Sequence, residues 1–243
     1  MKKRLSCIIS VLFLSALSIG CSARISGTLN AAGRADLSIN AGLGPKASAM
    51  MSRILSGTGA SQSVLLDAQM LNTSLSRLPG IEKALFINKT ADSIEGELVI
   101  TKIDELISKS SGTAGPASQF VSWEQKGHGG KTVFYLDKTN GPKLIALLSP
   151  ELSSYLSSIM APLVTGEELM KKEYLDLISA VYGGAIAQEI AASRIKVSLK
   201  FPAKISGIKG GVYKDNTAEF DISLLDILVV ETPLSYEIVW GEP

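Results

Sequence analysis

The first 21 residues constrain the fold most, because they decide where the folded part of the chain begins. The segment opens with three bases at positions 2–4, continues with a mostly apolar run over residues 5–17, and reaches Cys21 through small residues. A positive start, a short apolar stretch and small residues before a cleavage site are typical of a secretory signal peptide. We therefore expect residues 1–20 to be removed and residues 21–243 to form a single extracytoplasmic domain.

The end of this segment, Leu17-Ser18-Ile19-Gly20-Cys21, resembles the lipobox of bacterial lipoproteins, with Ser18 where leucine is usual. In that family the cysteine thiol receives a diacylglycerol and becomes the first residue of the mature chain. The resemblance implies that Cys21 is the lipid attachment site and that the protein sits at the cell membrane or the outer membrane. One acyl chain binds a membrane only marginally, whereas two or more give stable anchoring.

Two alternatives to the lipid anchor remain open at this point. No charge falls between Arg4 and Arg24, so the segment is close to the roughly 20 residues that a transmembrane helix needs. Five serines dilute that span, and its densest apolar part has only the length of a signal peptide core. The second alternative is ordinary cleavage after Gly20 or Ala23, which would release a secreted protein.

Charge and cysteine content narrow the classes of function. Without residues 1–20 the chain loses three bases and no acid, so 21 bases face 23 acids. No basic stripe with interleaved aromatic residues is present, and we expect no nucleic-acid partner. Cys7 lies in the removed segment and Cys21 is acylated, which leaves no free thiol and no disulfide in the mature domain. We expect neither a metal nor a cofactor.

The first half of the chain alternates between patterns typical of strands and of helices. Apolar and polar residues alternate over much of residues 24–43, which predicts a strand or a strand pair that starts almost directly after Cys21. Helices are expected over residues 46–56 and 64–78. Strands are expected around residues 85–87 and 94–100, with a turn between them.

A hairpin over residues 120–137 is the clearest strand pair, and its turn is Gly127-His128-Gly129-Gly130. His128 is the chain's single histidine, which excludes multi-histidine metal sites and the common Ser/His/Asp and Cys/His catalytic arrangements. A turn flanked by glycines holds no second ligand. We therefore interpret His128 as a solvated turn residue.

The middle of the chain is predicted to be helical. One helix is expected over residues 149–160, and a longer helix starts from a capping box in which Thr165 pairs with Glu168. We interpret the paired carboxylates Glu167 and Glu168 as first-turn residues that complement the helix dipole. The helix carries an apolar stripe that is expected to pack on the sheet, and a charge at Val181 is expected to destabilise the fold. The stripe consists of Met170, Tyr174, Leu177, Ile178, Val181 and Tyr182.

The C-terminal part reads as a β meander, with clean alternation over residues 194–201 and 219–224 and a last strand over 234–240. The whole order predicts an α+β fold: an antiparallel sheet with helices packed on one face, a helical block in the middle and the meander at the end. A strand followed by two helices, further strands and a long helix loosely resembles helix-grip lipid-binding folds. The lipobox, early strand, helical middle and closing hairpin over residues 211–222 resemble LppM-type bacterial lipoproteins. This resemblance implies an envelope protein with lipid or glycolipid binding, and it carries over no functional residue.

Three classes of function were weighed. We favour a non-catalytic envelope lipoprotein with a structural, assembly or interaction role. The alternative is a lipoprotein that binds a lipid or another small hydrophobic ligand in an apolar cavity between the long helix and the sheet. An enzyme is the least favoured, because the sequence has no Gly-x-Ser-x-Gly, no phosphate-binding glycine loop and no metal-ligand cluster.

Overall fold

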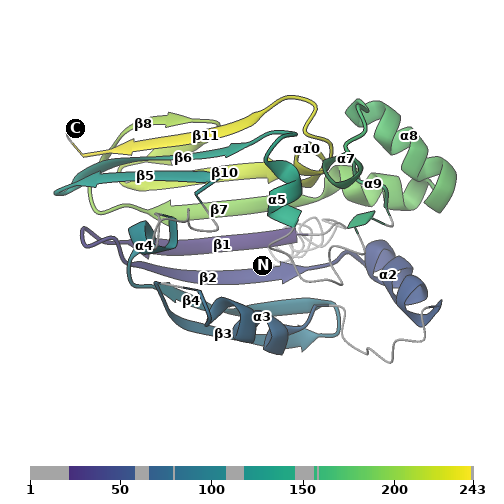
Figure 1. The fold of residues 1–243 in the computed structure, drawn as a ribbon, viewed down its shortest axis with the longest axis horizontal. Coiled ribbons are helices and arrows are strands. Elements are labelled where there is room, and N and C mark those ends of the chain that lie inside the picture. Colours follow the sequence, from purple (N-terminus) through teal and green to yellow (C-terminus); the bar gives the residue numbers. More distant parts are fainter. Residues whose placement is uncertain are drawn as a thin grey trace, which may run out of the picture.

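The fold is described from a computed structural model for residues 22–57, 66–78, 80–107, 118–145, 156–157 and 159–241. These residues form two β-sheets and a set of helices (Figure 1). Both Cys21 and most of the helix expected over residues 149–160 lie outside the described residues. The predicted α+β class is confirmed.

The large sheet has seven strands in the order β3-β4-β2-β1-β7-β10-β9. All neighbours in it are antiparallel except β1 and β7, which are parallel. Its strands are β1 (Ser22–Leu29), β2 (Ala35–Gly42), β3 (Ile81–Thr90), β4 (Ser93–Ile100), β7 (Arg194–Lys200), β9 (Val212–Lys214) and β10 (Thr217–Ser223).

The small sheet has four antiparallel strands in the order β5-β6-β11-β8. It lies over the β7–β10 half of the large sheet (Figure 1), and buried side chains from both sheets form one core. Trp240 joins them: its ring centroid lies 4.8 Å from that of Phe201 and 4.9 Å from that of Trp123. The strands of the small sheet are β5 (Val121–Lys126), β6 (Gly129–Leu136), β8 (Ile205–Lys209) and β11 (Leu234–Trp240).

Most helices gather beyond one end of the sheets, while α3 lies over β3 and β4 and α4 lies at the opposite end (Figure 1). The predicted helical block therefore packs mainly past the strand ends. The helices are α2 (Pro45–Gly57), α3 (Ala68–Leu75), α4 (Ile103–Ile107), α5 (Gly141–Ile145), α7 (Pro162–Thr165), α8 (Lys171–Tyr182), α9 (Gly184–Ala192) and α10 (Leu224–Val229).

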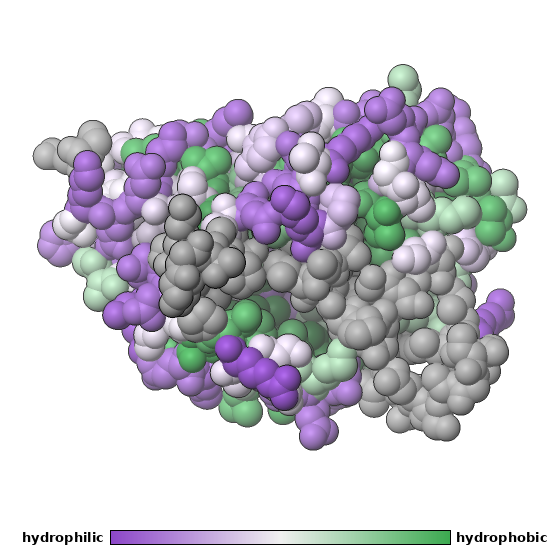
Figure 2. All heavy atoms as spheres, viewed as in Figure 1, coloured by the Kyte–Doolittle hydropathy of each residue, from purple (hydrophilic) through white to green (hydrophobic). Residues whose placement is uncertain are grey.

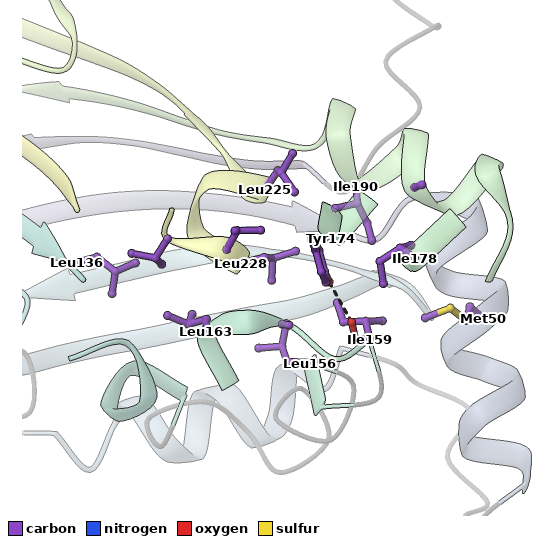
Figure 3. Packing of buried hydrophobic residues seen from close by; sticks show 14 of the residues in the cluster. Met50, Leu136, Leu156, Ile159, Leu163, Tyr174, Ile178, Ile190, Leu225 and Leu228 are labelled. Carbon is purple, nitrogen blue, oxygen red and sulfur yellow. Dashed lines mark hydrogen bonds between the residues drawn. The ribbon is translucent and has the colours of Figure 1, made fainter. Parts of the chain in front are cut away.

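The helical end has its own hydrophobic core, in which Tyr174 and Ile178 of α8 are completely buried (Figure 3). The Tyr174 hydroxyl donates a hydrogen bond to the carbonyl oxygen of Ile159 at 3.1 Å. This bond satisfies the polar end of a side chain that is otherwise surrounded by aliphatic groups. Met50, Leu163 and Leu228 bring α2, α7 and α10 into the same core.

A buried carboxylate connects two of these helices. Glu189 of α9 is 3% exposed, and its carboxylate accepts the backbone N–H groups of Lys46 at 3.0 Å and Ala47 at 2.7 Å. These donors open α2, where N–H groups have no partner inside the helix. Gly44 permits the contact, because a Cβ there would lie 2.4 Å from the Glu189 carboxyl carbon. A side chain 142 residues away thus caps α2.

The capping box predicted at Thr165 and Glu168 is wrong. Helix α8 begins at Lys171, and the reciprocal carboxylate is that of Glu173, which accepts the backbone N–H of Met170 at 2.8 Å. Gly166, at φ 75°, ends the preceding short helix α7 in the left-handed region, so no helix continues through this stretch. The local capping pattern in the sequence did not indicate that α7 ends at Gly166.

The predicted stripe on α8 is only partly correct. Tyr174 and Ile178 are fully buried, but Met170 is 59% exposed and Val181 is 53% exposed. Helix α8 packs at the end of the sheets. A narrower face of it is therefore buried than in a helix that lies flat on a sheet. The expectation that a charge at Val181 destabilises the fold is therefore wrong.

Paired substitutions on α8 test this packing. We expect Ile178→Asp to lower the free energy of unfolding by more than about 3 kcal/mol, because it buries an unpaired charge. Val181→Asp on the next turn should change it by less than about 0.5 kcal/mol, as for other exposed positions. Urea denaturation of both variants measures the difference. Equal destabilisation by the two variants would contradict this description of α8.

The burial of Tyr174 predicts a dependence on pH. Desolvation raises its pKa above the ordinary value near 10, so the folded protein keeps the phenol neutral where the unfolded chain ionises it. The resulting stabilisation is complete below about pH 10 and is lost as pH rises toward the folded-state pKa, by up to about 1.4 kcal/mol per pH unit. Tyr174→Phe lacks this component.

Urea denaturation of the wild type and Tyr174→Phe measures this effect. Near neutral pH the variant should be less stable by about 1 kcal/mol, the value of a typical hydrogen bond. The gap should shrink as pH rises above about 10. The pKa values of Tyr236 and Tyr135 are raised too, but both tyrosines are present in each protein and cancel in the difference. A constant gap would show that Tyr174 ionises equally well in both states.

Candidate functional site

The strand that follows Cys21 lies in the middle of the large sheet. Ser22 is the first residue of β1 and is already paired with Gly42 of β2 and Arg194 of β7. Cys21 itself is outside the described residues. Because consecutive Cα atoms are about 3.8 Å apart, a group attached to Cys21 is held next to the sheet with no linker between.

The two faces of the large sheet differ in polarity, because side chains alternate along each strand. The outer face carries Arg24 of β1 and Ser38 of β2, whose polar side chains are both exposed. The inner face is apolar and points toward the small sheet and α3. Register preserves this division across the parallel pair, since Ile25 lies opposite both Ile39 and Val197.

The centre of the inner face is only partly covered. Its flanks are buried, with Phe86 and Leu98 on one side and Phe220 on the other. Between them lies a continuous set of half-buried aliphatic side chains on β2, β1, β7 and β10, which we call the apolar floor. It consists of Ala23, Ile25, Leu37, Ile39, Ala41, Ile195, Val197, Leu199 and Ile222.

Small residues keep this floor low. Ala23 and Ala41 lie opposite each other, and Gly27 provides the space that Leu37 fills, because a Cβ on Gly27 would lie 2.6 Å from the Leu37 side chain. Figure 2 shows hydrophobic side chains at the surface of this side of the molecule beside the α3 region. Aliphatic side chains without polar groups at the centre of a sheet suit a hydrophobic ligand.

A second concave feature lies at the opposite end from α8. It is an open groove of about 640 Å³ between the β1–β2 turn, α4 and β5. The Gln125 side chain crosses it and donates to the carbonyl oxygen of Ala31 at 2.7 Å. Asp104, Glu124 and Lys126 carry mixed charges around it. The ligand-binding alternative required an apolar cavity between the long helix and the sheet, but α8 packs into the helical core instead.

The side chains considered for catalysis are placed apart. His128 is exposed in the β5–β6 turn, which confirms its interpretation as a turn residue. Glu167 and Glu168 are exposed and precede α8, so their assignment to a helix's first turn is wrong. Within the described residues, no group of three or more His, Cys, Asp or Glu side chains could hold a metal ion.

Shifted pKa values fall on groups with structural partners. The Asp137 carboxylate accepts the backbone N–H groups of Thr139 and Asn140, each at 2.8 Å, and these bonds lower its pKa. The ion pair of Lys171 with Asp226, at 2.7 Å, raises the pKa of the lysine. These contacts order a turn and the helical end, and neither faces the apolar floor.

The sequence patterns indicated many of the strands that make up the floor but not the floor itself. Alternation in residues 24–43 and 194–201 showed which side chains share a face. It did not show that β1 and β7 are neighbours, because a parallel pair leaves no local turn between its strands.

Comparisons with known proteins give little more. No family model and no curated protein matches the chain. Among solved structures it is similar to the folded domain of LppM from Mycobacterium tuberculosis, determined by NMR. That match covers 92% of this chain and 91% of the other, at 12% sequence identity and a TM-score of 0.40. This likeness transfers no residue role.

The described helices were also compared with the requirements of a membrane span. None of them is long and apolar enough to cross a bilayer. The segment before Ser22, where the sequence leaves a transmembrane alternative open, lies outside this comparison.

Proposed function

We propose that this protein is a bacterial envelope lipoprotein, anchored to the cell membrane or the outer membrane through a diacylglycerol on Cys21, with a non-catalytic structural, assembly or interaction role. The observation that carries the proposal is the lipobox-like sequence ending one residue before β1. A lipid at this position holds the large sheet at the membrane surface. The exposure of His128, Glu167 and Glu168, with the histidine in a different part of the fold from the two glutamates, supports a role without catalysis.

The anchor is tested by replacing each cysteine in turn. We expect Cys21→Ala to abolish acylation and leave unprocessed precursor, because the acceptor thiol is missing. Cys7→Ala is the matched control, since this thiol lies in the segment that the proposal removes. Intact mass spectrometry of detergent-extracted protein should find a mature chain starting at Cys21 with added acyl mass in the wild type and in Cys7→Ala.

Other masses would decide against the anchor. An unmodified full-length chain would favour the transmembrane alternative, and an unacylated chain cut after Gly20 or Ala23 would favour a secreted protein. Membrane retention of Cys21→Ala at the mature mass without lipid would also overturn the proposal.

A second candidate function is binding of a lipid or another small hydrophobic ligand. The half-buried apolar floor favours it, because a sheet face that only completed a core would be covered like its flanks. The ligand would lie along β1 and β7, with its apolar part against Ile25 and Val197. This places the site over the sheet centre and away from α8.

Filling the floor tests this second function. Ala41→Phe adds a ring on the inner face of β2, and we expect it to lower the amount of retained ligand on the order of tenfold, the effect of about 1.4 kcal/mol. Ser38→Phe places the same ring on the outer face and serves as the control. Native mass spectrometry of the extracted proteins measures retained non-covalent lipid. Equal retention by the two variants, or none in the wild type, would exclude the floor as a ligand site.

A further inference from the structure

Two neighbouring cations on the outer face of the large sheet are left without an ion pair. Arg24 of β1 and Lys196 of β7 lie opposite each other in the parallel register, and both are exposed. Like charges directly opposite each other on a sheet are destabilising. Among the described residues neither has an acidic partner within ion-pair distance.

Neighbouring charges leave this corner of the sheet basic. Arg194 lies opposite Ser22. One of its guanidinium nitrogens donates to the carbonyl oxygens of Ala191 and Ser193. Its Nε lies 3.8 Å from a carboxylate oxygen of Asp221. Asp221 is also in register with Lys196. We call Arg24, Arg194 and Lys196 the basic corner. Its three cations adjoin Asp221 and, one row further along β10, Glu219, so bases outnumber acids there.

On the β3–β4 side of the same face, bases are paired. Lys83 binds Glu97 and Lys89 binds Glu95, each at 2.7 Å across β3 and β4. Glu95 is therefore neutralised locally, and only Asn40 stands between it and Arg24 in the cross-strand row. The basic corner thus differs in its pairing from the β3–β4 side of the face, whereas Lys200 of β7, further along the same face, also has no ion pair among the described residues.

Large apolar side chains are exposed along both edges of this face. Leu85 is 52% exposed and Ile87 is 56% exposed, and they stand in register with the outer-face residues Glu97 and Glu95. Val212 on β9, at the opposite edge, is 66% exposed. Bases near the middle and aliphatic residues at the rims are the composition of a surface that contacts lipid headgroups and the adjoining acyl region.

The closeness of the basic corner to Cys21 indicates which partner this surface contacts. Arg24 lies three residues beyond Cys21 along an extended strand, about 10 Å away. We propose that the outer face of the large sheet docks on the membrane that holds the anchor, with the basic corner against anionic phospholipid headgroups. This inference rests on the proposed anchor at Cys21. The inner face and the small sheet then point away from the bilayer.

The expected strength follows from surface electrostatics. Each lysine or arginine close to an anionic leaflet strengthens association about fivefold, so two bases contribute about 25-fold. The attraction falls off over a Debye length, about 10 Å at 0.1 M salt and about 3 Å at 1 M. Docking should therefore need anionic lipid and should weaken as salt is raised.

The test uses the acylated protein reconstituted in vesicles of phosphatidylcholine, with or without phosphatidylglycerol. Because Cys21 is acylated, a thiol-reactive fluorophore labels only an introduced cysteine. Ser38→Cys places it on the outer face and Ser206→Cys on β8 of the small sheet. Quenching by headgroup-labelled lipid reports the ratio of docked to undocked protein. We expect strong quenching at position 38 with phosphatidylglycerol, weaker quenching at 1 M salt, and little at position 206.

Charge variants separate the basic corner from net charge. Arg24→Gln with Lys196→Gln should lower the docked ratio about 25-fold. Lys126→Gln with Lys209→Gln also removes two bases, but both are exposed residues of the small sheet, on the side away from the proposed membrane surface, and the docked ratio should stay within about twofold. Thermal denaturation of each double variant confirms that it is folded.

Three outcomes would overturn the inference. These are equal quenching with and without phosphatidylglycerol, equal effects of the two double variants, or stronger quenching at position 206 than at position 38. The intact mass of the same sample separates the two proposals. Acylated protein that does not dock overturns the docking surface alone, whereas protein without acyl mass overturns the anchor and the docking surface together.

Discussion

The parallel pairing of β1 with β7 holds the two halves of the large sheet together. Strands β3, β4 and β2 are attached to β1, and β10 and β9 are attached to β7, so this pair is the junction between them. Seven residue pairs form it, from Ser22 with Arg194 to Thr28 with Lys200. Parallel strands need a crossover connection, and the remaining strands and helices between β1 and β7 in the chain all belong to that connection.

The same junction fixes the two faces of the molecule. A shift of one residue in either strand would exchange the polar and apolar sides, so the polarity pattern selects the register. With the observed register, Ile25 and Val197 adjoin on the inner face while Arg24 and Lys196 adjoin on the outer face. The apolar floor and the basic corner are therefore opposite sides of one strand pair.

Local patterns predicted what depends on neighbours along the chain. The hairpin turning at His128, the turn after β3 and the alternation in β7 and β10 follow from residues close in sequence, and the structure confirms them. The prediction that the helix starts at Thr165 was wrong, because the reciprocal capping contact is made further along the chain, by the carboxylate of Glu173. The cap that Glu189 provides for α2 acts across 142 residues, and no local pattern indicates such a contact.

Pairing between strands far apart in the sequence also explains where the structure differs from the predicted fold. The C-terminal strands were expected as one meander, but β8 and β11 belong to the small sheet while β7, β9 and β10 belong to the large one. That division places Trp240 against Phe201 and creates the layered core between the sheets. The burial of α8 in a core at the strand ends keeps this helix away from the sheet centre.

If the outer face lies on the bilayer, the apolar floor opens on the side away from it, because a sheet separates its two faces completely. A hydrophobic ligand would then reach the floor around an edge of the large sheet. The two edges differ: Asn72 of α3 bonds both backbone groups of Phe86 on β3, at 2.7 Å and 2.9 Å, which closes that edge to a further strand. Strand β9 at the other edge has only three residues. The order of strands in one sheet would thus determine how the proposed anchor, docking surface and ligand site lie relative to one another.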